Sequence, residues 1–515
     1  MIAQFVEKHD KKVQRLLEIV PGFLTWSLIL SPIWLGLLFP KAIIAFLIFL
    51  TVYWIYLATK GTIGGILGYR KFKKEMGTDW MNELAKLDFT TLPDRTTLPA
   101  TLSSVKHFIL IPMVNEGHSV LSTTLNALLN QTFPVKQVTL VLTIEEKYFE
   151  ESKNTILEIL GDNINKFEEV LIYGHPSGIE GEAIGAGAAN RAWGAKSAVN
   201  HLVSTNKPIR DYIFTTIDAD HVMDEQYLAR LTHLYLSSDK RDYKYYSSAV
   251  YLFNNNLWDV PAVMRIEANF VTLGTLSDWG GWHNPSTKDT FSAYSTSLQT
   301  LIDADYWDVS LGIDDTIFYW RAFFARNGDF KGVQHYIPFS ADAVQGSSYI
   351  DSYKSLYKQL LRWGYGVIDF PLSIKEFFKN NKVPRTLKVM WIINHLHKRV
   401  LLINIVFLIT FGFTITTLVN PDIKQTIFAY SLPNIMSLIL SFTMIFLIPG
   451  IILRAKIAKP MPEHWPVWKK ALHFMETPLL LINLLTYSFI PFIDAQTRVM
   501  LGKKLKDLYH TPKVR

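Results

Sequence analysis

The sequence predicts a mixed α/β domain that is inserted between membrane-spanning helices at the two ends of the chain. The chain has 515 residues, of which 49% are hydrophobic, and its uncharged apolar segments crowd the two ends. Between these ends, short apolar runs alternate with helical patterns, as in βαβ units that build a mostly parallel sheet. Acidic residues follow the apolar runs, at the edge where such sheets bind ligands. The length suggests two or three structural units.

Two uncharged segments near the start are each long enough to cross a hydrocarbon core of about 30 Å. They are Gly22–Phe39 and Ala42–Ala58, and only Pro40 and Lys41 separate them. A cleaved signal peptide is disfavoured, because a second apolar segment follows at once and no small-residue cleavage site is present. We therefore expect an N-terminal transmembrane hairpin over residues 1–68.

Three further uncharged segments predict C-terminal transmembrane helices within residues 401–515. They are Leu401–Asn420, Thr426–Leu453 and Thr477–Ile493. Lysine and arginine clusters flank the N-terminal hairpin on the side of the N-terminus and the central domain. The positive-inside rule therefore predicts a multi-pass protein of the cell (plasma) membrane with a cytoplasmic central domain. Three complete C-terminal spans would place the basic tail outside, so we follow the charge and expect segment 477–493 to enter and leave on one side.

Composition narrows the classes of function. The net charge of +7 is explained by basic residues that flank the membrane segments, so no nucleic-acid partner is expected. The absence of Cys excludes disulfides, zinc–thiolate sites and thiol catalysis. No P-loop motif is present, and GAGAAN (185–190) is a weak match to a dinucleotide-binding loop, because Asn190 stands at its third glycine position.

Four short, nearly continuous apolar runs in the central domain predict strands that are covered on both faces. They span residues 107–113, 138–143, 170–173 and 212–217, with helical patterns at 119–131, 151–160 and 187–199. Polar residues follow the runs, namely Asn115, Glu116, Glu145, Glu146, His175, Asp218 and Asp220. Because the carboxyl ends of parallel strands meet at one edge, these side chains form an acidic rim that suits a cation or a hydroxyl-rich ligand.

Asp218 and Asp220 are the first candidate site. Two carboxylates one residue apart at the end of a strand can share Mg²⁺ or Mn²⁺, which prefer oxygen ligands and leave positions open for phosphate. The alternative is a helix cap. Asp224 is better placed as the cap of the helical pattern at 225–235, which favours the metal site.

Asp314 and Asp315 are the second candidate site, at the start of a helical pattern. An acid at a helix N-terminus is favoured as a cap and by the helix dipole. One acid is enough for the cap, and the neighbouring charge would raise the proton affinity of the other, as a general base needs. On the residues alone, a cap and a base are equally good explanations.

Gln359, Arg362 and Trp363 are the third candidate site. At helical spacing i, i+3 and i+4 they share one face, which offers an amide, a phosphate-binding guanidinium and an aromatic platform. The alternative is an amphipathic helix at the membrane surface, and the two interpretations are compatible. We expect residues 69–345 to form the soluble domain and residues 346–400 to form interfacial amphipathic helices.

Four motifs, in this order, resemble the signatures of the membrane-bound family 2 glycosyltransferases, such as cellulose, hyaluronan and chitin synthases and their lipid-modifying relatives. They are IPMVNEG (111–117), DAD (218–220), DD (314–315) and QLLRW (359–363). The resemblance covers about residues 105–370. It implies a GT-A fold, which is a Rossmann-like domain that transfers sugars from nucleotide diphospho-sugars.

The resemblance also implies an activity and roles for individual residues. The activity would be inverting, metal-dependent transfer of a sugar from a UDP- or GDP-sugar to a growing glycan or, alternatively, a single addition to a membrane lipid. An export partner is left open. Donor binding would fall to Asn115, Glu116, Glu145 and Arg362, metal binding to Asp218 and Asp220, proton removal to Asp315, and diphosphate and acceptor contacts to Gln359, Arg362 and Trp363. Trp279, Trp282 and the segment 291–297, which contains Tyr294, are candidates for the acceptor side, because sugars stack on aromatic faces. Asp314 is a further candidate there. Asp314 departs from the Glu that is usual in the family.

Overall fold

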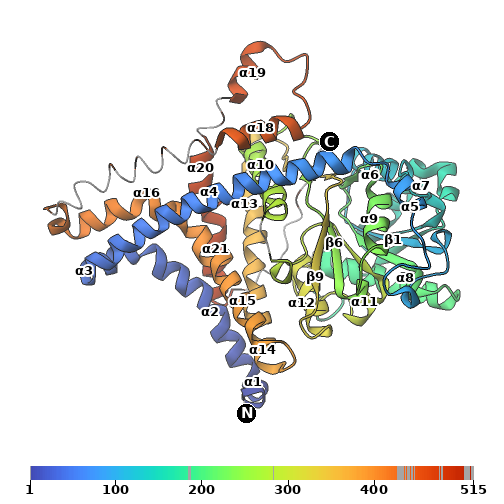
Figure 1. Ribbon diagram of the computed structural model, residues 1–515, viewed down its shortest axis with the longest axis horizontal. Helices are drawn as coiled ribbons and strands as arrows, with labels where there is room; N and C mark the ends of the chain where they lie inside the picture. The colour runs from blue at the N-terminus through green and yellow to red at the C-terminus, as the bar shows by residue number, and fades with distance from the viewer. Residues whose placement is uncertain are drawn as a thin grey trace.

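The computed structural model describes most of the chain. The residues outside the description are 1, 184–186, 282–283, 426–433, 435–436, 438–440, 442–444, 446, 475, 477–478, 504–510 and 512–515. A mixed α/β domain lies at one end of the molecule, and long apolar helices extend away from it at the other end (Figure 1). The predicted α/β class is therefore confirmed.

A seven-stranded sheet forms the centre of the α/β domain, in the order β3-β2-β1-β4-β8-β6-β9. Strands β1 to β4 are parallel to one another, and β8 runs antiparallel to both of its neighbours. The bounds are β1 Lys106–Met113, β2 Val138–Glu145, β3 Glu169–His175, β4 Tyr212–Thr216, β6 Lys244–Ser248, β8 Tyr294–Ser297 and β9 Lys331–His335. Each of the four apolar runs found in the sequence forms one of the strands β1 to β4, which confirms the predicted parallel-rich sheet.

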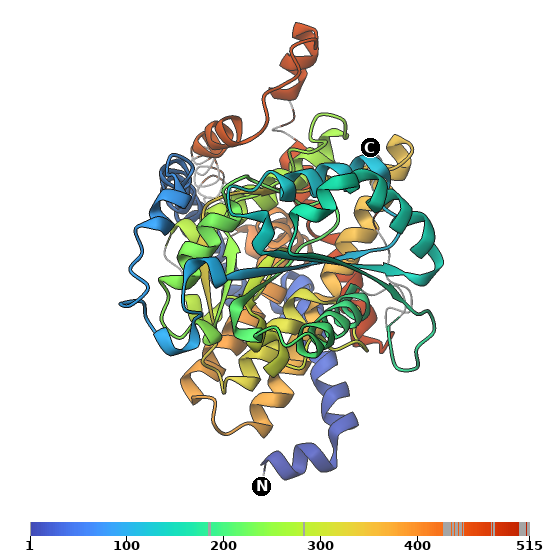
Figure 2. The same ribbon diagram turned by 90° about the vertical axis from the view of Figure 1, so that its right-hand side faces the viewer.

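Helices cover both faces of the sheet (Figure 2), so these strands are apolar on both sides. Alternate residues of β1 enter two different cores. Ile109 packs into the core that contains α6 His118–Leu129 and α7 Phe149–Leu160. Phe108 packs into the other core, against buried alanines of α8 Gly187–Ser204. This period of two explains why the strand reads as a continuous apolar run.

A second, three-stranded sheet brings together two acids that are distant in sequence, Asp220 and Asp342. Its order is β5-β10-β7, with bounds Val222–Met223, Phe339–Ser340 and Tyr251–Leu252. Strand β10 runs antiparallel to β5. The residues that precede β5 therefore lie beside those that follow β10.

The remaining helices of the α/β domain are short, apart from one. Their bounds are α5 Trp80–Ala85, α9 Tyr227–Leu236, α10 Ala262–Gly280, α11 Leu298–Asp303 and α12 Asp315–Ala325. The predicted cap of α9 is displaced. The Asp224 carboxylate accepts a hydrogen bond from Gln226 N–H at 3.1 Å, and the helix begins only at Tyr227. Asp224 thus closes the turn before the helix and does not cap its first turn.

The first predicted span is bent. Residues 10–38 form α2 Asp10–Ile29 and α3 Ser31–Leu38, which follow α1 Ile2–Lys8 and meet at an angle of 62°. Pro32 lies in the first turn of α3. It has no N–H to continue the hydrogen bonding of α2, which is a common cause of such a bend.

Three helices in the described part of the chain are long and apolar enough to cross a membrane, and the bent pair would make a fourth. They are α4 Pro40–Met76, the helix Arg385–Val419 and residues Leu479–Met500. The predicted unit boundaries at residues 68 and 400 fall inside the first two. The segment Thr426–Leu453 lies largely outside the described residues. The number of spans and the side of the membrane remain predictions.

Helix α4 joins the other long apolar helices to the α/β domain through α10. The two helices touch at backbone level, because a Cβ at Gly64 would lie only 2.2 Å from Ser277 O. Small residues allow helices to approach this closely. The long α4 therefore holds the α/β domain through a packed helix pair and not through a linker.

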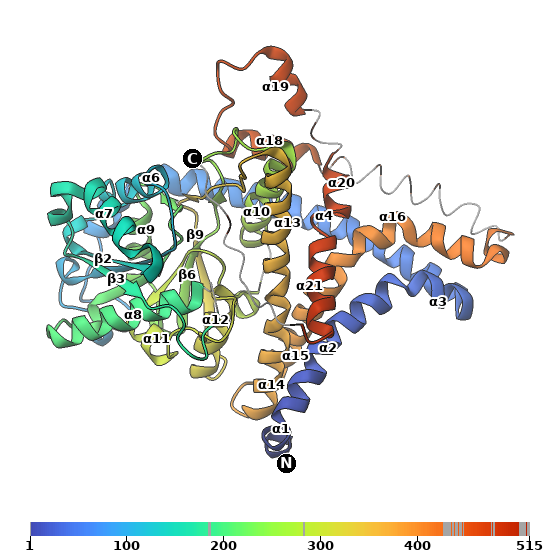
Figure 3. The ribbon, with the colours of Figure 1, turned by 180° about the vertical axis from the view of Figure 1, so that it is seen from behind.

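The predicted interfacial region contains α13 Tyr349–Gly364, α14 Asp369–Lys379 and α15 Arg385–Leu396, and α15 continues into α16 Leu402–Val419. The last helices are α18 Leu447–Ile457, α19 Val467–Phe474, α20 Leu479–Leu485 and α21 Ile490–Met500. Helix α21 packs along α13 and α2. In Figure 1 and Figure 3, α13 and α21 stand upright between the α/β domain and the far ends of α3 and α16.

Candidate active site

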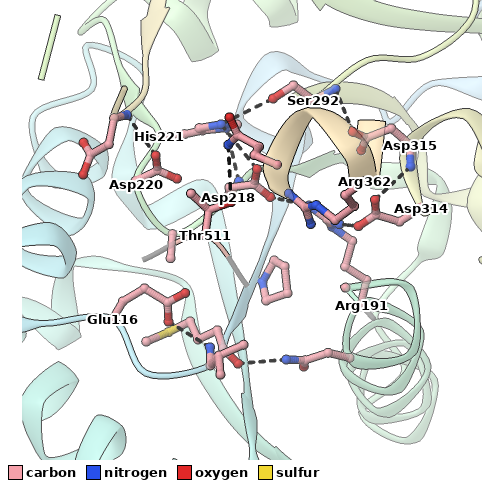
Figure 4. A pocket seen from close by; sticks show the side chains of 18 of the residues that line it. Glu116, Arg191, Asp218, Asp220, His221, Ser292, Asp314, Asp315, Arg362 and Thr511 are labelled. Atoms are coloured by element: carbon pink, nitrogen blue, oxygen red, sulfur yellow. Dashed lines mark hydrogen bonds and ion pairs between the residues drawn. The ribbon is translucent and has the colours of Figure 1, made fainter. Parts of the chain in front are cut away.

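A cavity of about 200 Å³ lies at the carboxyl ends of β1, β2 and β4. Its wall is completed by the first turn of α8, the first turn of α12 and the last turn of α13. The ends of the parallel strands, α8, α12 and α13 therefore meet at one place. Figure 4 shows Arg191 of α8, Asp315 of α12 and Arg362 of α13 close to one another there. This is the edge of the sheet that the sequence predicts for ligand binding.

The wall of the cavity is strongly acidic. Seven carboxylic acids line it, against two arginines. The acids are Glu116, Glu145, Asp218, Asp220, Asp314, Asp315 and Asp342, and the arginines are Arg191 and Arg362. Carboxylates that share a small site repel one another unless a cation balances them. The wall therefore suits a ligand that brings positive charge with it.

The first acid pair follows β4. The Asp220 side chain is 1% exposed, and its Oδ2 accepts a hydrogen bond at 2.9 Å from the backbone N–H of Asp342, which follows β10. Asn255 bonds both the carbonyl of Asp220 and the carboxylate of Asp342, each at 2.9 Å. The Asp218 side chain is 46% exposed and faces the cavity. The pair thus has one fixed, buried member and one accessible member.

Asp218, Asp220 and His221 can each offer one ligand atom, and these atoms lie within 4.8 Å of one another. His221 Nδ1 accepts the backbone N–H of Asp218 at 3.2 Å. A neutral ring bonded in this way carries its proton on Nε2, which faces Asp218 Oδ2 at 3.6 Å and Ser292 Oγ at 3.4 Å. The two carboxylates are therefore the ligands that suit Mg²⁺ or Mn²⁺, and His221 orients Asp218 beside them.

The second acid pair begins α12. Asp314 is the N-cap residue, and its Oδ1 accepts a hydrogen bond from Asp315 N–H at 3.1 Å. Asp315 is the first residue of the helix. Its Oδ2 accepts a hydrogen bond from Ser292 N–H at 3.1 Å, while its buried Oδ1 has no hydrogen-bond partner among the described residues. Ser292 holds this N–H in place with a φ of 52°, in the left-handed region that non-glycine residues seldom adopt.

Asp315 has the electrostatic properties of a general base. Burial raises the pKa of its carboxyl group to about 6. The nearby Arg191 guanidinium lowers this pKa, and the Asp218 carboxylate raises it further. A base works best when its pKa lies close to the working pH. The structure thus separates the two acids of the pair into a cap and a buried group with an available oxygen.

Arg191 connects the two acid pairs. It lies on α8, is 4% exposed, and forms ion pairs with Asp218, at 2.5 Å, and with Asp314. Its Nε donates to Thr216 Oγ1 at 3.0 Å, which ties it to the end of β4. Gly187 leaves room for this contact, because a Cβ there would lie 2.6 Å from Asp314 Oδ2.

The last turn of α13 closes the cavity on the side of the long apolar helices. Gln359, Arg362 and Trp363 all line it, as their shared helical face predicts. Gln359 donates to Thr511 Oγ1 at 3.4 Å. Arg362 Nε is buried and has no hydrogen-bond partner among the described residues. An unpaired guanidinium N–H beside acidic groups can receive an anionic oxygen.

Two of the three residues that are predicted to lie near the donor nucleoside line the cavity. Glu116 and Glu145 line the cavity, whereas Asn115 is exposed and does not. Glu116 Oε2 accepts from Val114 N–H at 2.8 Å. Glu145 lies 3.2 Å from His175 Nδ1, and Glu182 lies 3.0 Å from His175 Nε2. Burial lowers the pKa of His175, but the two carboxylates outweigh it and raise this pKa above its ordinary value.

The predicted acceptor aromatics are placed elsewhere. Trp279 is buried against α4 residues in a separate core, and Tyr294 is fully buried, where it accepts a hydrogen bond from Trp307 Nε1 at 2.9 Å. Neither lines the cavity, and Trp282 lies outside the described residues. The assignment of Trp279 and Tyr294 to the acceptor side is corrected, because both side chains fill cores. The aromatic residues on the cavity wall are Tyr251, Phe253, Phe291 and Trp363.

Several residues of the site are absent from the sequence-based prediction. Asp342 follows the short strand β10. Asp218 is selected because it is an acid that follows a strand, and the same criterion would select Asp342. His221 is adjacent to Asp220 in sequence. Ser292 belongs to the segment 291–297, which is predicted for the acceptor side, but its contact with Asp315 is not predicted. For Arg191 the sequence offers no comparable signal, because its contacts join segments that are far apart in the chain.

No family model matches the chain, and no curated protein matches it. Among solved structures, the mannosyltransferase PcManGT from Pyrobaculum calidifontis, in complex with GDP-Man and Mn²⁺, is similar over 78% of this chain and 98% of its own, with 13% identity and a TM-score of 0.40. An S. aureus TarS chain in complex with UDP-GlcNAc is similar over 78% of this chain and 93% of its own, with 13% identity and a TM-score of 0.33. The function of the chain is therefore inferred from its own site.

Proposed function

We propose that the chain is a membrane-bound, inverting glycosyltransferase of family 2 with a GT-A fold, which transfers a sugar from a UDP- or GDP-sugar with the help of Mg²⁺ or Mn²⁺. One observation carries this proposal. The buried Asp315, with a carboxylate oxygen that has no partner among the described residues, shares a small cavity with the acid pair Asp218 and Asp220 and with the unpaired Nε of Arg362. A base, a metal site and an anion site in one cavity are the parts that this reaction needs.

Asp315 is the base of the proposed reaction. Its Oδ1 accepts the proton of an acceptor hydroxyl, and the freed oxygen attacks the anomeric carbon of the donor sugar. The bond from that carbon to the diphosphate breaks as the new glycosidic bond forms, which inverts the configuration at the anomeric carbon. Because burial raises the pKa of Asp315 to about 6, the group can take a proton and is still ionised at neutral pH.

Two groups would stabilise the negative charge of the leaving diphosphate, namely the metal and Arg362. Asp218 and Asp220 would hold the metal, which neutralises charge on the diphosphate when it is bound. Arg362 donates to the diphosphate from α13, through the Nε that has no partner among the described residues. Glu116 and Glu145 lie on the nucleoside side of the cavity, and Gln359 lies beside Arg362 on the same wall.

The acceptor binds on the aromatic side of the cavity in this proposal. Trp363 from α13 and Phe253 and Phe291 from the α/β domain supply apolar faces on which sugar rings stack. A growing glycan is the first candidate acceptor. A membrane lipid that receives a single sugar is the second, because the described residues contain at most four candidate spans, which is few for a polysaccharide channel.

The test is a screen of nucleotide sugars with the full chain in native membranes or detergent, in which release of the nucleoside diphosphate is measured. We expect release with one donor class, and release that is lower by about 10²–10⁴-fold from Asp315→Asn. Labelled products are then sized by gel and by lipid extraction. A ladder of products supports a polymerase, and a single glycolipid supports the second acceptor. If wild type binds nucleotide sugars but releases no diphosphate with any donor or lipid fraction, the chain is a sugar-binding protein and the proposal is wrong.

We also infer that the protein is a multi-pass protein of the cell membrane, with residues 1–68 and 401–515 in the membrane part and the α/β domain in the cytoplasm. The chain contains no Cys, so a single introduced cysteine can be labelled selectively. A cysteine at Lys153, on the surface of α7, should react with an impermeant maleimide only after cells are opened. Reaction in intact cells would contradict the cytoplasmic placement.

A further inference from the structure

Arg191 occupies the position between the two acid pairs where an incoming cation would be attracted. Its guanidinium bonds one member of each pair, Asp218 from the first and Asp314 from the second. It is 4% exposed, yet it forms part of the cavity wall. Arg191 thus already neutralises part of the acidic wall that a metal would neutralise.

The two partners of Arg191 differ in how firmly they are held. Asp314 caps α12 through Asp315 N–H, so it is fixed by the helix that it begins. Asp218 is 46% exposed and faces the cavity. An exposed carboxylate can exchange one charged partner for another at little cost, because water screens the change. The bond from Arg191 Nη2 to Asp218 is therefore the one that can open.

We propose that Arg191 is the resident counter-ion of the site, which competes with a divalent cation for Asp218 and turns to the diphosphate once Asp218 holds the cation. The pair with Asp314 and the bond to Thr216 keep the guanidinium in place during this exchange. The identity of the anion as a donor diphosphate rests on the proposed function, while the competition for Asp218 does not.

The competition has a consequence for affinity. A fixed positive charge beside Asp218 and Asp220 repels a cation, so a divalent metal alone binds weakly. A diphosphate adds negative charge that both the metal and Arg191 can share, so metal and nucleotide favour each other's binding. Arg191 in this way makes metal binding depend on the presence of the donor.

The test measures Mn²⁺ binding to the purified full chain by electron paramagnetic resonance of the free ion, with and without UDP or GDP. Without nucleotide, we expect Arg191→Gln to bind Mn²⁺ at least about tenfold more tightly than wild type, because one repelling charge is removed at close range. Nucleotide should strengthen Mn²⁺ binding of wild type by a larger factor than that of Arg191→Gln. Equal or weaker Mn²⁺ binding by a folded Arg191→Gln would overturn the proposal.

Two further variants separate competition from a loss of structure. Asp314→Asn keeps a capping side chain but removes one partner of Arg191, so the guanidinium stays on Asp218 and Mn²⁺ affinity should not rise. If Asp314→Asn tightens Mn²⁺ binding as much as Arg191→Gln does, the competition is refuted. Arg230→Gln is the matched control, because Arg230 is also held in an ion pair, with Glu75 at 2.8 Å, but does not line the cavity. It should leave Mn²⁺ affinity unchanged, and tighter binding there would contradict a local effect.

This test does not require sugar transfer. If Arg191→Gln tightens Mn²⁺ binding but no donor is ever turned over, the counter-ion role stands and the proposed function fails. If wild type transfers sugar but Arg191→Gln and wild type bind Mn²⁺ equally, the function stands and the counter-ion role fails. Should Arg191→Gln not fold, Arg191→Met gives the same decision, because it also removes the charge and should bind Mn²⁺ more tightly than wild type. Arg191→Lys keeps the charge and should bind Mn²⁺ as weakly as wild type. Tight binding by Arg191→Lys would contradict the charge as the cause.

Discussion

The two acid pairs of the cavity have the same chemistry and opposite surroundings. In the first pair, Asp218 is 46% exposed and Asp220 is fixed by the backbone N–H of Asp342. In the second pair, Asp314 caps α12, and Asp315 is buried with one oxygen unpartnered among the described residues. Each pair thus has one fixed acid, Asp220 or Asp314, and one available acid, Asp218 or Asp315. The available acid is exposed to the cavity in the first pair and has a buried oxygen in the second.

The difference teaches that burial decides which role an available carboxylate can take. Asp218 is open to the cavity, so it can exchange partners and hold a cation. Asp315 is only partly exposed, and burial raises its pKa to about 6, so it can take up a proton. The first pair therefore suits a metal, the second suits a base, and Arg191 pairs with one acid of each.

The largest expected effect comes from Asp315. Asp315→Asn should lower turnover by about 10²–10⁴-fold, the usual contribution of a general base, while donor binding is kept. The pKa of Asp315 is raised from 3.8 to about 6 in the folded chain, which therefore loses stability as the pH rises through this window. Asp315→Asn should accordingly unfold at the same or a higher temperature than wild type at pH 7.5. Full turnover by this variant would remove Asp315 from the mechanism.

The next largest effect on turnover is expected from the first acid pair, Asp218 and Asp220. Asp218→Asn should lower turnover by about a hundredfold or more, because metal stabilisation of the leaving diphosphate is worth several kcal/mol. Chelation of wild type with EDTA should stop turnover, and added Mn²⁺ or Mg²⁺ should restore it. Turnover that is insensitive to EDTA would show that the pair does not act through a metal.

The pH dependence of turnover should follow the ionisation of Asp315, the available acid of the second pair. Turnover should fall about tenfold per pH unit below about 6 and be level above it, since Asp315 must be ionised to accept a proton. The Asp218 carboxylate raises this pKa and the Arg191 guanidinium lowers it. Single-turnover rates should therefore shift their midpoint downward in Asp218→Asn and upward in Arg191→Gln. Midpoints that do not move would place the titrating group elsewhere.

A smaller effect is expected at the α13 wall. Arg362→Lys keeps the charge but loses the planar set of N–H donors, so the affinity for UDP or GDP should fall about tenfold. Calorimetry with the nucleoside diphosphate measures this without any acceptor. An unchanged affinity would show that the Nε of Arg362, which has no partner within the described part of the chain, does not contact the diphosphate.

The smallest effect on activity is expected where the sequence-based assignment is corrected. Tyr294→Phe should leave turnover unchanged within about twofold. It should lower the stability of the chain by about 1–3 kcal/mol, because Trp307 Nε1 loses its buried acceptor. Thermal unfolding of the full chain measures the loss. A large fall in turnover without a loss of stability would return Tyr294 to the acceptor side.

Much of the site is determined by local patterns. The apolar runs predict strands β1 to β4, and parallel strands bring the residues after their carboxyl ends to one edge, so Glu116, Glu145, Asp218 and Asp220 lie together at the cavity. Helical spacing predicts that Gln359, Arg362 and Trp363 share a face, and all three line the cavity. These predictions succeed because the periods of strands and helices are properties of short segments.

Other features depend on contacts between segments that are distant in sequence. The sequence determined the α/β alternation, the apolar ends and the two acid pairs, because hydrophobic period and residue chemistry are local. Only the tertiary structure decided that Arg191 joins Asp218 to Asp314, that Ser292 meets Asp315, and that Trp279 and Tyr294 fill cores. Burial and charge pairing depend on which surfaces come into contact. Asp218 and Asp314 are 27 and 123 positions from Arg191 in sequence, and they reach it only after the sheet and helix α12 have packed against α8.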